Sequence, residues 1–417
     1  MPGVREGPET PRRAVHLVRH RTRVSRGRDR LGGVRAPPAA GGRLTGRLGL
    51  ALALAAAFAF AGCGSTAKHP PLPHLAHQLP GWLGLNYNSD AGVGSLDQFA
   101  SHGIVYDRDG SIEPNAGQLA TRRSRFGRAL AISIGAGMTP DIEVDSDAGP
   151  KGCTTNPSGR GWCLPVGSEG IEEYVRGFVR TAQSVLRLFP GKRLVFEPTD
   201  EPWDWAWPPG TVSGSRAADE YAHLLAQLLP AIARAAHPRI RLADVYVPAT
   251  SALADGTEWI PDLYASEPCL APGRGPCEPG APATPIEGWN VHPYGVPDTP
   301  RQGIESVPLI RREMRSGAGN VIVSELGFCA TNVIGAEDCM ENTPAVDADE
   351  GETAALLAVT LREALPMHRA GWLRALIIWA RAYPFQRSGT GWAMEDPNGI
   401  LTPMGAALVR FGASTLH

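Results

Sequence analysis

Carboxylates and aromatic side chains gather in the stretch RLVFEPTDEPWDW, which runs from Arg193 to Trp205. Asp200 and Glu201 are adjacent where an apolar, strand-like run ends, and Trp203 follows shortly after them. Adjacent like charges repel, and apolar surroundings favour the protonated form of an acid. An acid that stays protonated near neutral pH can deliver a proton, so this pair indicates acid–base chemistry.

A second carboxylate, Glu325, stands at the end of a later strand-like run, VIVSELG. Between it and Glu201 lies the sequence VHPYG, which contains His292 and Tyr294, and Trp379 ends a further apolar run. Two carboxyl groups surrounded by aromatic side chains are what glycoside hydrolysis requires, because one protonates the leaving oxygen while the other attacks or stabilises the sugar carbon. The flat faces of Trp and Tyr can stack on sugar rings.

Eight strand-like runs alternate with polar loops and helical periodicity, which predicts a parallel sheet with helical crossovers. The predicted strands cover residues 82–86, 103–106, 129–134, 193–196, 240–247, 289–291, 321–324 and 375–379. The predicted helices cover residues 171–188, 217–236, 304–315, 353–370 and 404–411. Eight such units over residues 80–417 favour a (β/α)8 TIM barrel. An open doubly wound sheet is the rival, but no glycine-rich phosphate motif follows the first strand.

Functional side chains of such a barrel project from the carboxyl ends of its strands. Reading those ends adds Asn86, after the first strand, and Asp107 and Arg108, after the second, to the residues already named. We therefore expect Asn86 and Trp203 to line the same cleft as the two glutamates.

The motifs FEPTDEPW, NVHPYG, VIVSELGF and LIIWA, in this order, resemble clan A of the glycoside hydrolases, including its cellulase-like and xylosidase-like members. The resemblance covers the whole barrel region and rests on the order and spacing of short motifs. It implies a (β/α)8 barrel and a retaining mechanism, with Glu201 as the acid/base and Glu325 as the nucleophile. It also implies that Tyr294 bonds the nucleophile, that His292 belongs to the site, and that Trp379 floors the cleft.

Two positions depart from the clan's pattern. Asp200 stands where the clan has an Asn whose amide donates to the substrate's 2-hydroxyl. An ionised Asp can only accept a hydrogen bond, and its negative charge would favour a protonated Glu201. The clan's second-strand Arg has only Arg108 as a candidate, at the wrong register.

The charge distribution argues against nucleic-acid binding by the folded part. The 417 residues carry a formal net charge of −2, but residues 1–50 hold 12 Arg against 3 acidic residues. The remainder therefore has 28 basic and 39 acidic residues, and an acidic body repels phosphate backbones. The expected partner is a carbohydrate, and neither a metal nor an organic cofactor is implied.

The N-terminal part predicts export. Residues 1–47 are rich in Arg, Gly and Pro and read as a disordered basic segment or an over-extended gene start. Residues 48–63 are an apolar run that ends in FAGC, and with the following Gly64 and Ser65 this resembles the lipobox of bacterial lipoproteins, with lipid attached to Cys63. Residues 64–79 form a linker. Ordinary secretion is the alternative to a lipid anchor on the outer face of the bacterial cell membrane.

Seven cysteines fit this export prediction. With Cys63 assigned to lipid, six remain, and they fall into three close pairs, Cys153/Cys163, Cys269/Cys277 and Cys329/Cys339. Close spacing in an oxidising compartment favours three local disulfides, although six cysteines allow other pairings. None of the pairs has the spacing of a zinc site. The pairs follow the third, fifth and seventh predicted strands, which would place all three at the cleft end of the barrel.

Together these observations predict an exported, monomeric, retaining glycosidase that acts on β-linked oligo- or polysaccharides. Two alternatives remain open from the sequence, namely a non-catalytic carbohydrate-binding lipoprotein and a transglycosylase. The sequence does not name the sugar.

Overall fold

A computed structural model describes residues 81–86, 96–108, 112, 114–145, 167–202, 214–236, 243–248, 259–281, 286–294, 303–314, 320–330, 349–379, 393–396 and 399–415. The chain divides into two compact units, Met1–His74 and Leu75–His417, and every described residue belongs to the second. The predicted boundary at residue 80, the signal segment and the linker therefore lie outside the described residues. None of the described helices combines the length and apolar character needed to cross a membrane.

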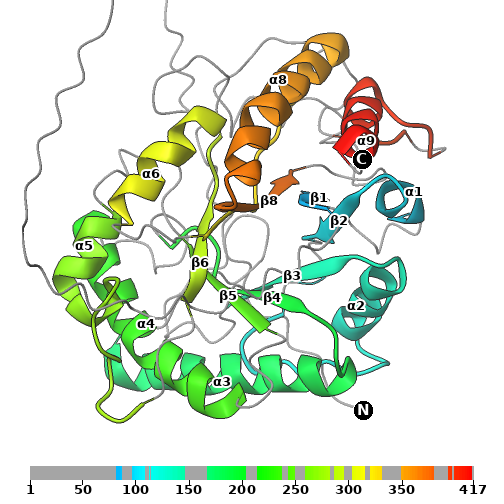
Figure 1. Ribbon diagram of the computed structural model, residues 1–417. Coiled ribbons are helices and arrows are strands. Elements are labelled where there is room, and N and C mark those ends of the chain that lie inside the picture. Colours follow the sequence, from blue (N-terminus) through cyan, green and yellow to red (C-terminus); the bar gives the residue numbers. More distant parts are fainter. Residues whose placement is uncertain are drawn as a thin grey trace, which may run out of the picture. The chain divides into compact units, whose positions relative to one another are not determined.

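The described residues contain eight parallel strands that pair in sequence order, and β8 pairs back onto β1, so the sheet is a closed barrel (Figure 1). The fold predicted from the sequence is confirmed. The strands are β1 Leu83–Leu85, β2 Ile104–Asp107, β3 Thr139–Val144, β4 Leu194–Pro198, β5 Ala243–Pro248, β6 Ile286–Val291, β7 Asn320–Val323 and β8 Leu373–Ile378.

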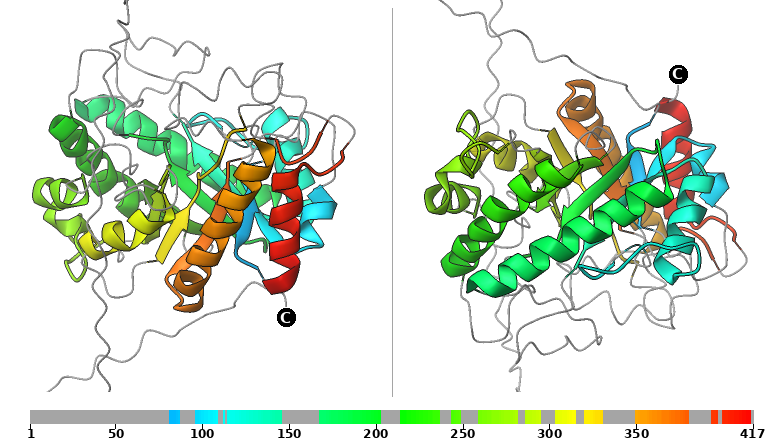
Figure 2. Two further views of the ribbon diagram at one scale, coloured as in Figure 1. Left: turned by 90° about the horizontal axis from the view of Figure 1, so that it is seen from above. Right: turned by 90° about the horizontal axis from the view of Figure 1, so that it is seen from below.

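Helices lie around the outside of the strands (Figures 1 and 2). They are α1 Leu96–Ala100, α2 Arg125–Gly135, α3 Gly167–Leu188, α4 Gly214–Ala236, α5 Trp259–Ser266, α6 Val307–Glu313, α8 Glu350–Arg369 and α9 Pro403–Thr415, with short 3-10 turns η4 Pro268–Leu270 and η5 Ile304–Ser306. Three predicted helices fall within observed ones: residues 171–188 within α3, 217–236 within α4 and 404–411 within α9. The predicted helix over residues 353–370 extends one residue beyond the end of α8.

The alternation of side chains along β3 and β4 separates an apolar outer face from an acidic interior. Ile142, Val144 and Phe196 pack in the main hydrophobic core between the sheet and the helices. Successive strand residues point to opposite faces, so Glu143 and Glu197 face the barrel interior. These two glutamates are paired across the β3–β4 register, and both are buried.

The third predicted strand is wrong. Residues 129–134 lie inside α2, where Ser124 caps the helix by accepting a hydrogen bond from the Gly127 amide. The run ALAISI alternates for only three steps, and its helical period is the stronger signal, since Phe126 and Leu130 are buried while Ile132 is half exposed. The true strand is β3, TPDIEV, in which acidic and apolar side chains alternate. Because acidic residues are typical of loops, this alternation did not predict a strand.

Cys269 and Cys277 form a disulfide, as the spacing predicted. This disulfide follows α5 and precedes β6, so it closes a loop on the opposite side of the barrel from the strand ends that bear the carboxylates. The expectation that all three pairs lie at the cleft end is therefore wrong for this pair. Cys329, after β7, is also in a disulfide, while Cys63, Cys153, Cys163 and Cys339 lie outside the described residues.

Candidate active site

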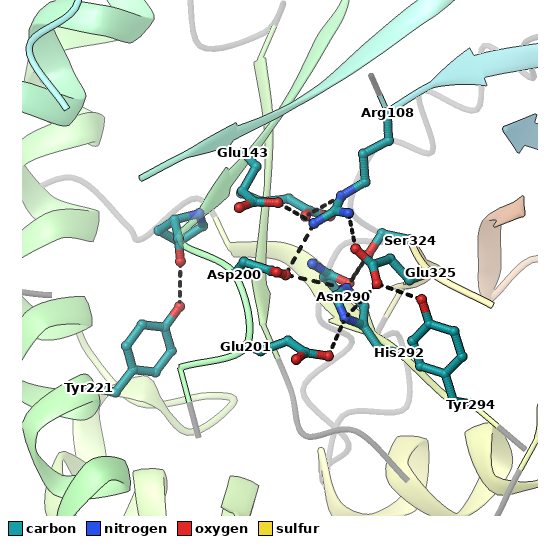
Figure 3. Close-up of polar contacts among 12 residues, drawn as sticks. Arg108, Glu143, Asp200, Glu201, Tyr221, Asn290, His292, Tyr294, Ser324 and Glu325 are labelled. Atoms are coloured by element: carbon teal, nitrogen blue, oxygen red, sulfur yellow. Dashed lines mark hydrogen bonds and ion pairs between the residues drawn. The ribbon is translucent and has the colours of Figure 1, made fainter. Parts of the chain in front are cut away.

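The chain turns sharply after β4, and this turn presents Asp200 and Glu201. Thr199 and Glu201 have φ angles of 68° and 33°, in the left-handed region that residues other than Gly avoid. Each such conformation costs roughly 1–3 kcal/mol and persists only where the surroundings fix it. The Tyr221 hydroxyl of α4 donates to the Pro198 carbonyl at 2.9 Å and fixes the start of the turn (Figure 3).

Arg108, directly after β2, lies among four carboxylates (Figure 3). Its guanidinium donates to Glu325 and Glu143 and, at 3.2 Å, to Asp200, and its Nε lies 3.4 Å from Glu197 Oε2. Burial alone would lower the pKa of Arg108, but the carboxylates raise that pKa well above its ordinary value. Arg108 is therefore a permanent positive charge in the barrel mouth.

Glu325, after β7, is held in its ionised form. The Tyr294 hydroxyl donates to Glu325 Oε2 at 2.7 Å, and His292 Nδ1 lies 3.5 Å from the same oxygen. Burial would raise the pKa of Glu325, but the charges of His292 and Arg108 and the hydrogen bonds from Tyr294 and Arg108 lower it. A buried, ionised carboxylate with a fixed orientation is suited to nucleophilic attack.

His292 connects Glu201 to a buried polar chain. Its Nε2 lies 3.0 Å from Ser324 Oγ, and Ser324 donates its hydrogen to Asn290 Oδ1. Ser324 must then accept from His292, so Nε2 carries a hydrogen. The other nitrogen, Nδ1, lies 3.0 Å from Glu201 Oε1. It can accept a proton from Glu201 or, when His292 is protonated, donate to the ionised glutamate.

The same nitrogen of His292 bounds the distance between the two glutamates. Glu201 Oε1 and Glu325 Oε2 lie 3.0 and 3.5 Å from His292 Nδ1, so these oxygens are at most 6.5 Å apart. Burial lowers the pKa of His292, but Glu325 and the hydrogen bond to Glu201 raise it above its ordinary value. His292 thus responds to the charge on both glutamates.

Two other carboxyl groups near Arg108, those of Asp200 and Glu197, take up a proton more readily than Glu325 does. Burial and the charge of Glu325 raise the pKa of Asp200 to about 7, although Arg108 opposes this shift. Burial and the neighbouring Asp141 raise the pKa of Glu197 well above its ordinary value. Protons on these groups therefore reduce the negative charge of the barrel interior near neutral pH.

Asp200, His292 and Glu325 form a group whose potential metal-ligand atoms lie within 4.8 Å of one another. Arg108 forms ion pairs with both of these carboxylates. Its guanidinium supplies the positive charge that a metal ion would bring, so the arrangement fits a cation-balanced acid cluster better than a metal centre.

Five of the predicted site residues meet at the barrel mouth, namely Asp200, Glu201, His292, Tyr294 and Glu325 (Figure 3). Asn86 is buried at the end of β1, and its side-chain nitrogen Nδ2 has no hydrogen-bond partner within the described residues. Trp379 is partly buried after β8, and its backbone amide donates to the Leu326 carbonyl at 2.9 Å. Trp203 lies outside the described residues.

Three residues of the cluster were missed or undervalued from the sequence. Arg108 looked misplaced because the second strand was predicted to end at Tyr106, whereas β2 continues to Asp107. With this longer strand, Arg108 alternates with Tyr106 into the interior. Glu143 was missed with the third strand. Nothing in the sequence around Glu197 distinguishes it from a structural residue, yet it faces Arg108.

The described barrel is similar to several solved glycoside hydrolases. A Bacteroidetes-affiliated GH5 cellulase matches with a TM-score of 0.50 and 16% identity, covering 81% of this chain and 91% of the other. A GH5-4 broad-specificity endoglucanase from Clostridium acetobutylicum matches with a TM-score of 0.51 and 14% identity, covering 80% and 96%. A GH39 β-xylosidase from Caulobacter crescentus matches with a TM-score of 0.51 and 16% identity, covering 80% and 71%.

No protein-family model matches the sequence, and no curated protein is similar to it at the sequence level. The resemblance to clan A is thus carried by three-dimensional structure and by the short motifs. The fold of this chain is that of the GH5 and GH39 glycoside hydrolases of clan A.

Proposed function

We propose that this protein is a retaining glycoside hydrolase that cleaves β-linked glycosides through a covalent intermediate. Glu325 attacks the anomeric carbon while Glu201 protonates the leaving oxygen. Glu201 then removes a proton from water, which releases the sugar from Glu325 with its original configuration. His292 Nδ1 lies beside Glu201 and can exchange the proton that this residue gains and loses.

The observation that carries the proposal is the upper limit of 6.5 Å between the nearest oxygens of Glu201 and Glu325. Retaining enzymes place their two carboxyl groups about 5–5.5 Å apart, whereas inverting enzymes need about 6.5–9.5 Å to admit a water molecule. The bound includes the retaining distance and meets the inverting range only at its lower limit, so it favours retention. The ionised state of Glu325 supports its role as nucleophile.

The substrate class and the location extend the same proposal. The structural neighbours include a cellulase, an endoglucanase and a β-xylosidase, so β-glucans and β-xylans are the first substrates to examine. The lipobox-like sequence ending at Cys63 supports export and lipid attachment at the outer face of the membrane.

The test compares the parent with Glu201→Ala and Glu325→Ala on a panel of β-glucans, β-xylans and aryl β-glycosides. Glu325→Ala should lower turnover by at least about 10⁴-fold, and added azide should yield the α-glycosyl azide. Glu201→Ala should lose about 10²–10⁴-fold on poor leaving groups, and azide should yield the β-glycosyl azide.

Several outcomes would overturn these assignments. Full activity in Glu325→Ala would remove it as nucleophile, and identical azide products from both variants would contradict the division of roles. Sugar binding without any reducing ends released by the parent would instead support a carbohydrate-binding protein. A transglycosylase would release sugar onto an acceptor carbohydrate rather than onto water.

A further inference from the structure

The charges around Arg108 do not balance if every acid is ionised. One guanidinium forms ion pairs with Glu143, Glu197, Asp200 and Glu325, whose side chains are at most 12% exposed. His292 can add a second positive charge, but Glu201 adds a further acid beside it. Uncompensated buried carboxylates take up protons because burial disfavours their charged form. At least one carboxyl group close to Arg108 must therefore be neutral.

The contacts separate Asp200 from Glu325 in this respect. Glu325 accepts hydrogen bonds from both Arg108 and Tyr294 and lies 3.5 Å from His292. Asp200 has one hydrogen bond, from Arg108 at 3.2 Å, and its distance to His292 Nε2 is 3.9 Å. Of these two acids, Asp200 has the poorer set of donors and is the one that accepts a proton near neutral pH, in agreement with its raised pKa of about 7. Glu197 also has a raised pKa, but it is fully buried.

The two oxygens of Asp200 have different surroundings. Oδ1 accepts from Arg108, so a proton on this side chain belongs on Oδ2. Both ion pairs of Asp200 also use Oδ1, and its side chain is 12% exposed. Oδ2 is therefore the oxygen left to meet a molecule bound beside Glu325.

We propose that Asp200 acts as a neutral carboxylic acid that donates a hydrogen bond from Oδ2 to a sugar oxygen beside Glu325. This inference rests on the proposed glycosidase function and assigns Asp200 a specificity role that an ionised carboxylate cannot fill. A protonated carboxyl group has one donor and one acceptor oxygen, like the amide of Asn. Protonated Asp200 thus provides a hydrogen-bond donor at this position, and the donor is present only while the carboxyl group keeps its proton.

The expected pH effect follows from the groups that face Asp200. Glu325, Glu201 and Glu197 favour its protonated form, while Arg108 and His292 favour its ionised form. Glu143 acts through the guanidinium that it shares with Asp200. As pH rises through about 7, Asp200 loses its proton and its donor, and its charge repels that of Glu325. Activity should therefore fall on the alkaline side.

The kinetic test measures kcat/KM between pH 5 and 9 for 2,4-dinitrophenyl β-glucoside and β-xyloside. Dinitrophenolate leaves as an anion, so cleavage of its glycosidic bond does not require a proton from Glu201. The parent should lose about tenfold per pH unit above pH 7, whereas Asp200→Asn should lose less than about threefold over the same range. An equal alkaline loss in both proteins would overturn the proposal.

Glu395→Gln is the matched control. Burial and the charge of Asp396 raise the pKa of Glu395 to about 7 as well. Neither Arg108 nor any of the carboxylates around it contributes to this shift. This variant should keep the alkaline loss of the parent. A flattened profile in Glu395→Gln would show that Asp200 is not the group responsible.

A second measurement does not depend on hydrolysis. Carbon-13 NMR of aspartate-labelled protein, with Asp200→Asn to assign the signal, should show Asp200 titrating near pH 7. A midpoint below about 5, close to an ordinary aspartate, would overturn the proposal even if the enzyme is active. If the parent cleaves no glycoside, the proposed function fails, and cellobiose binding at pH 6 and pH 8 decides the donor role. Binding that weakens at pH 8 in the parent but not in Asp200→Asn supports that role, and equal pH dependence in both contradicts it.

Discussion

Arg108 holds the acidic mouth of the barrel together. It is fully buried, and its three nitrogens contact carboxylates from β3, from β4 and the turn after it, and from the segment after β7. A buried ion pair adds little net stability compared with an apolar pair, but removing one partner leaves an uncompensated charge. The role of Arg108 is to keep Glu325 ionised and oriented within an acidic interior.

Arg108→Met should therefore destabilise the protein by about 3–5 kcal/mol at pH 8. The loss should be smaller at pH 5, because the carboxylates left without a partner take up protons there. Urea unfolding followed by tryptophan fluorescence measures both values.

The control for this substitution is Arg234→Met. Arg234 pairs with Glu278 in an ion pair whose side chains are 50% and 54% exposed, and such surface pairs contribute about 0–1 kcal/mol. Equal losses of stability in the two variants would contradict the central role of Arg108.

At the scale of elements, the strands place the acids and the helices fix the strands. Tyr174 of α3 donates to the Val144 carbonyl at the end of β3, and Tyr221 of α4 donates to the Pro198 carbonyl at the end of β4. Both strand ends are thereby held where their carboxylates approach Arg108. Helix α2 packs against β3 and supports it from the outside.

The two glycines of α2 offer a matched test of how tightly the start of this helix is packed. A Cβ atom at Gly127 would overlap the Thr121 carbonyl, whereas a Cβ at Gly135 meets nothing within 4 Å. Gly127→Ala should lower the free energy of unfolding by about 1–3 kcal/mol, and Gly135→Ala should raise it by up to about 1 kcal/mol. Equal shifts in urea unfolding would show that the tight contact at Gly127 does not matter.

The sequence predicted elements best where chemistry and strand ends coincide. Glu201, His292 and Glu325 stand within four residues of β4, β6 and β7, so their motifs placed those strands and the site together. The third strand could not be placed in this way, because its interior side chains are acids that a periodicity argument assigns to a loop. Arg108 became interpretable only with β2 extended by one residue.

The whole molecule brings together residues that are distant in sequence. Arg108 and Glu325 are separated by 217 positions and meet through a direct hydrogen bond. This convergence follows from the closed order of the barrel, in which every strand delivers its last residues to the same end. The sequence motifs could predict that convergence, but not the charge balance, which depends on side-chain distances across the barrel.

The most direct test of the central claim is a mass measurement after reaction with 2,4-dinitrophenyl 2-deoxy-2-fluoro-β-glucoside or the corresponding β-xyloside. The fluorine slows release of the covalent intermediate, so the protein should gain the mass of one fluorosugar, and the labelled peptide should carry it on Glu325. A label on another residue, or hydrolysis of ordinary aryl glycosides with inverted configuration and no label, would contradict the account.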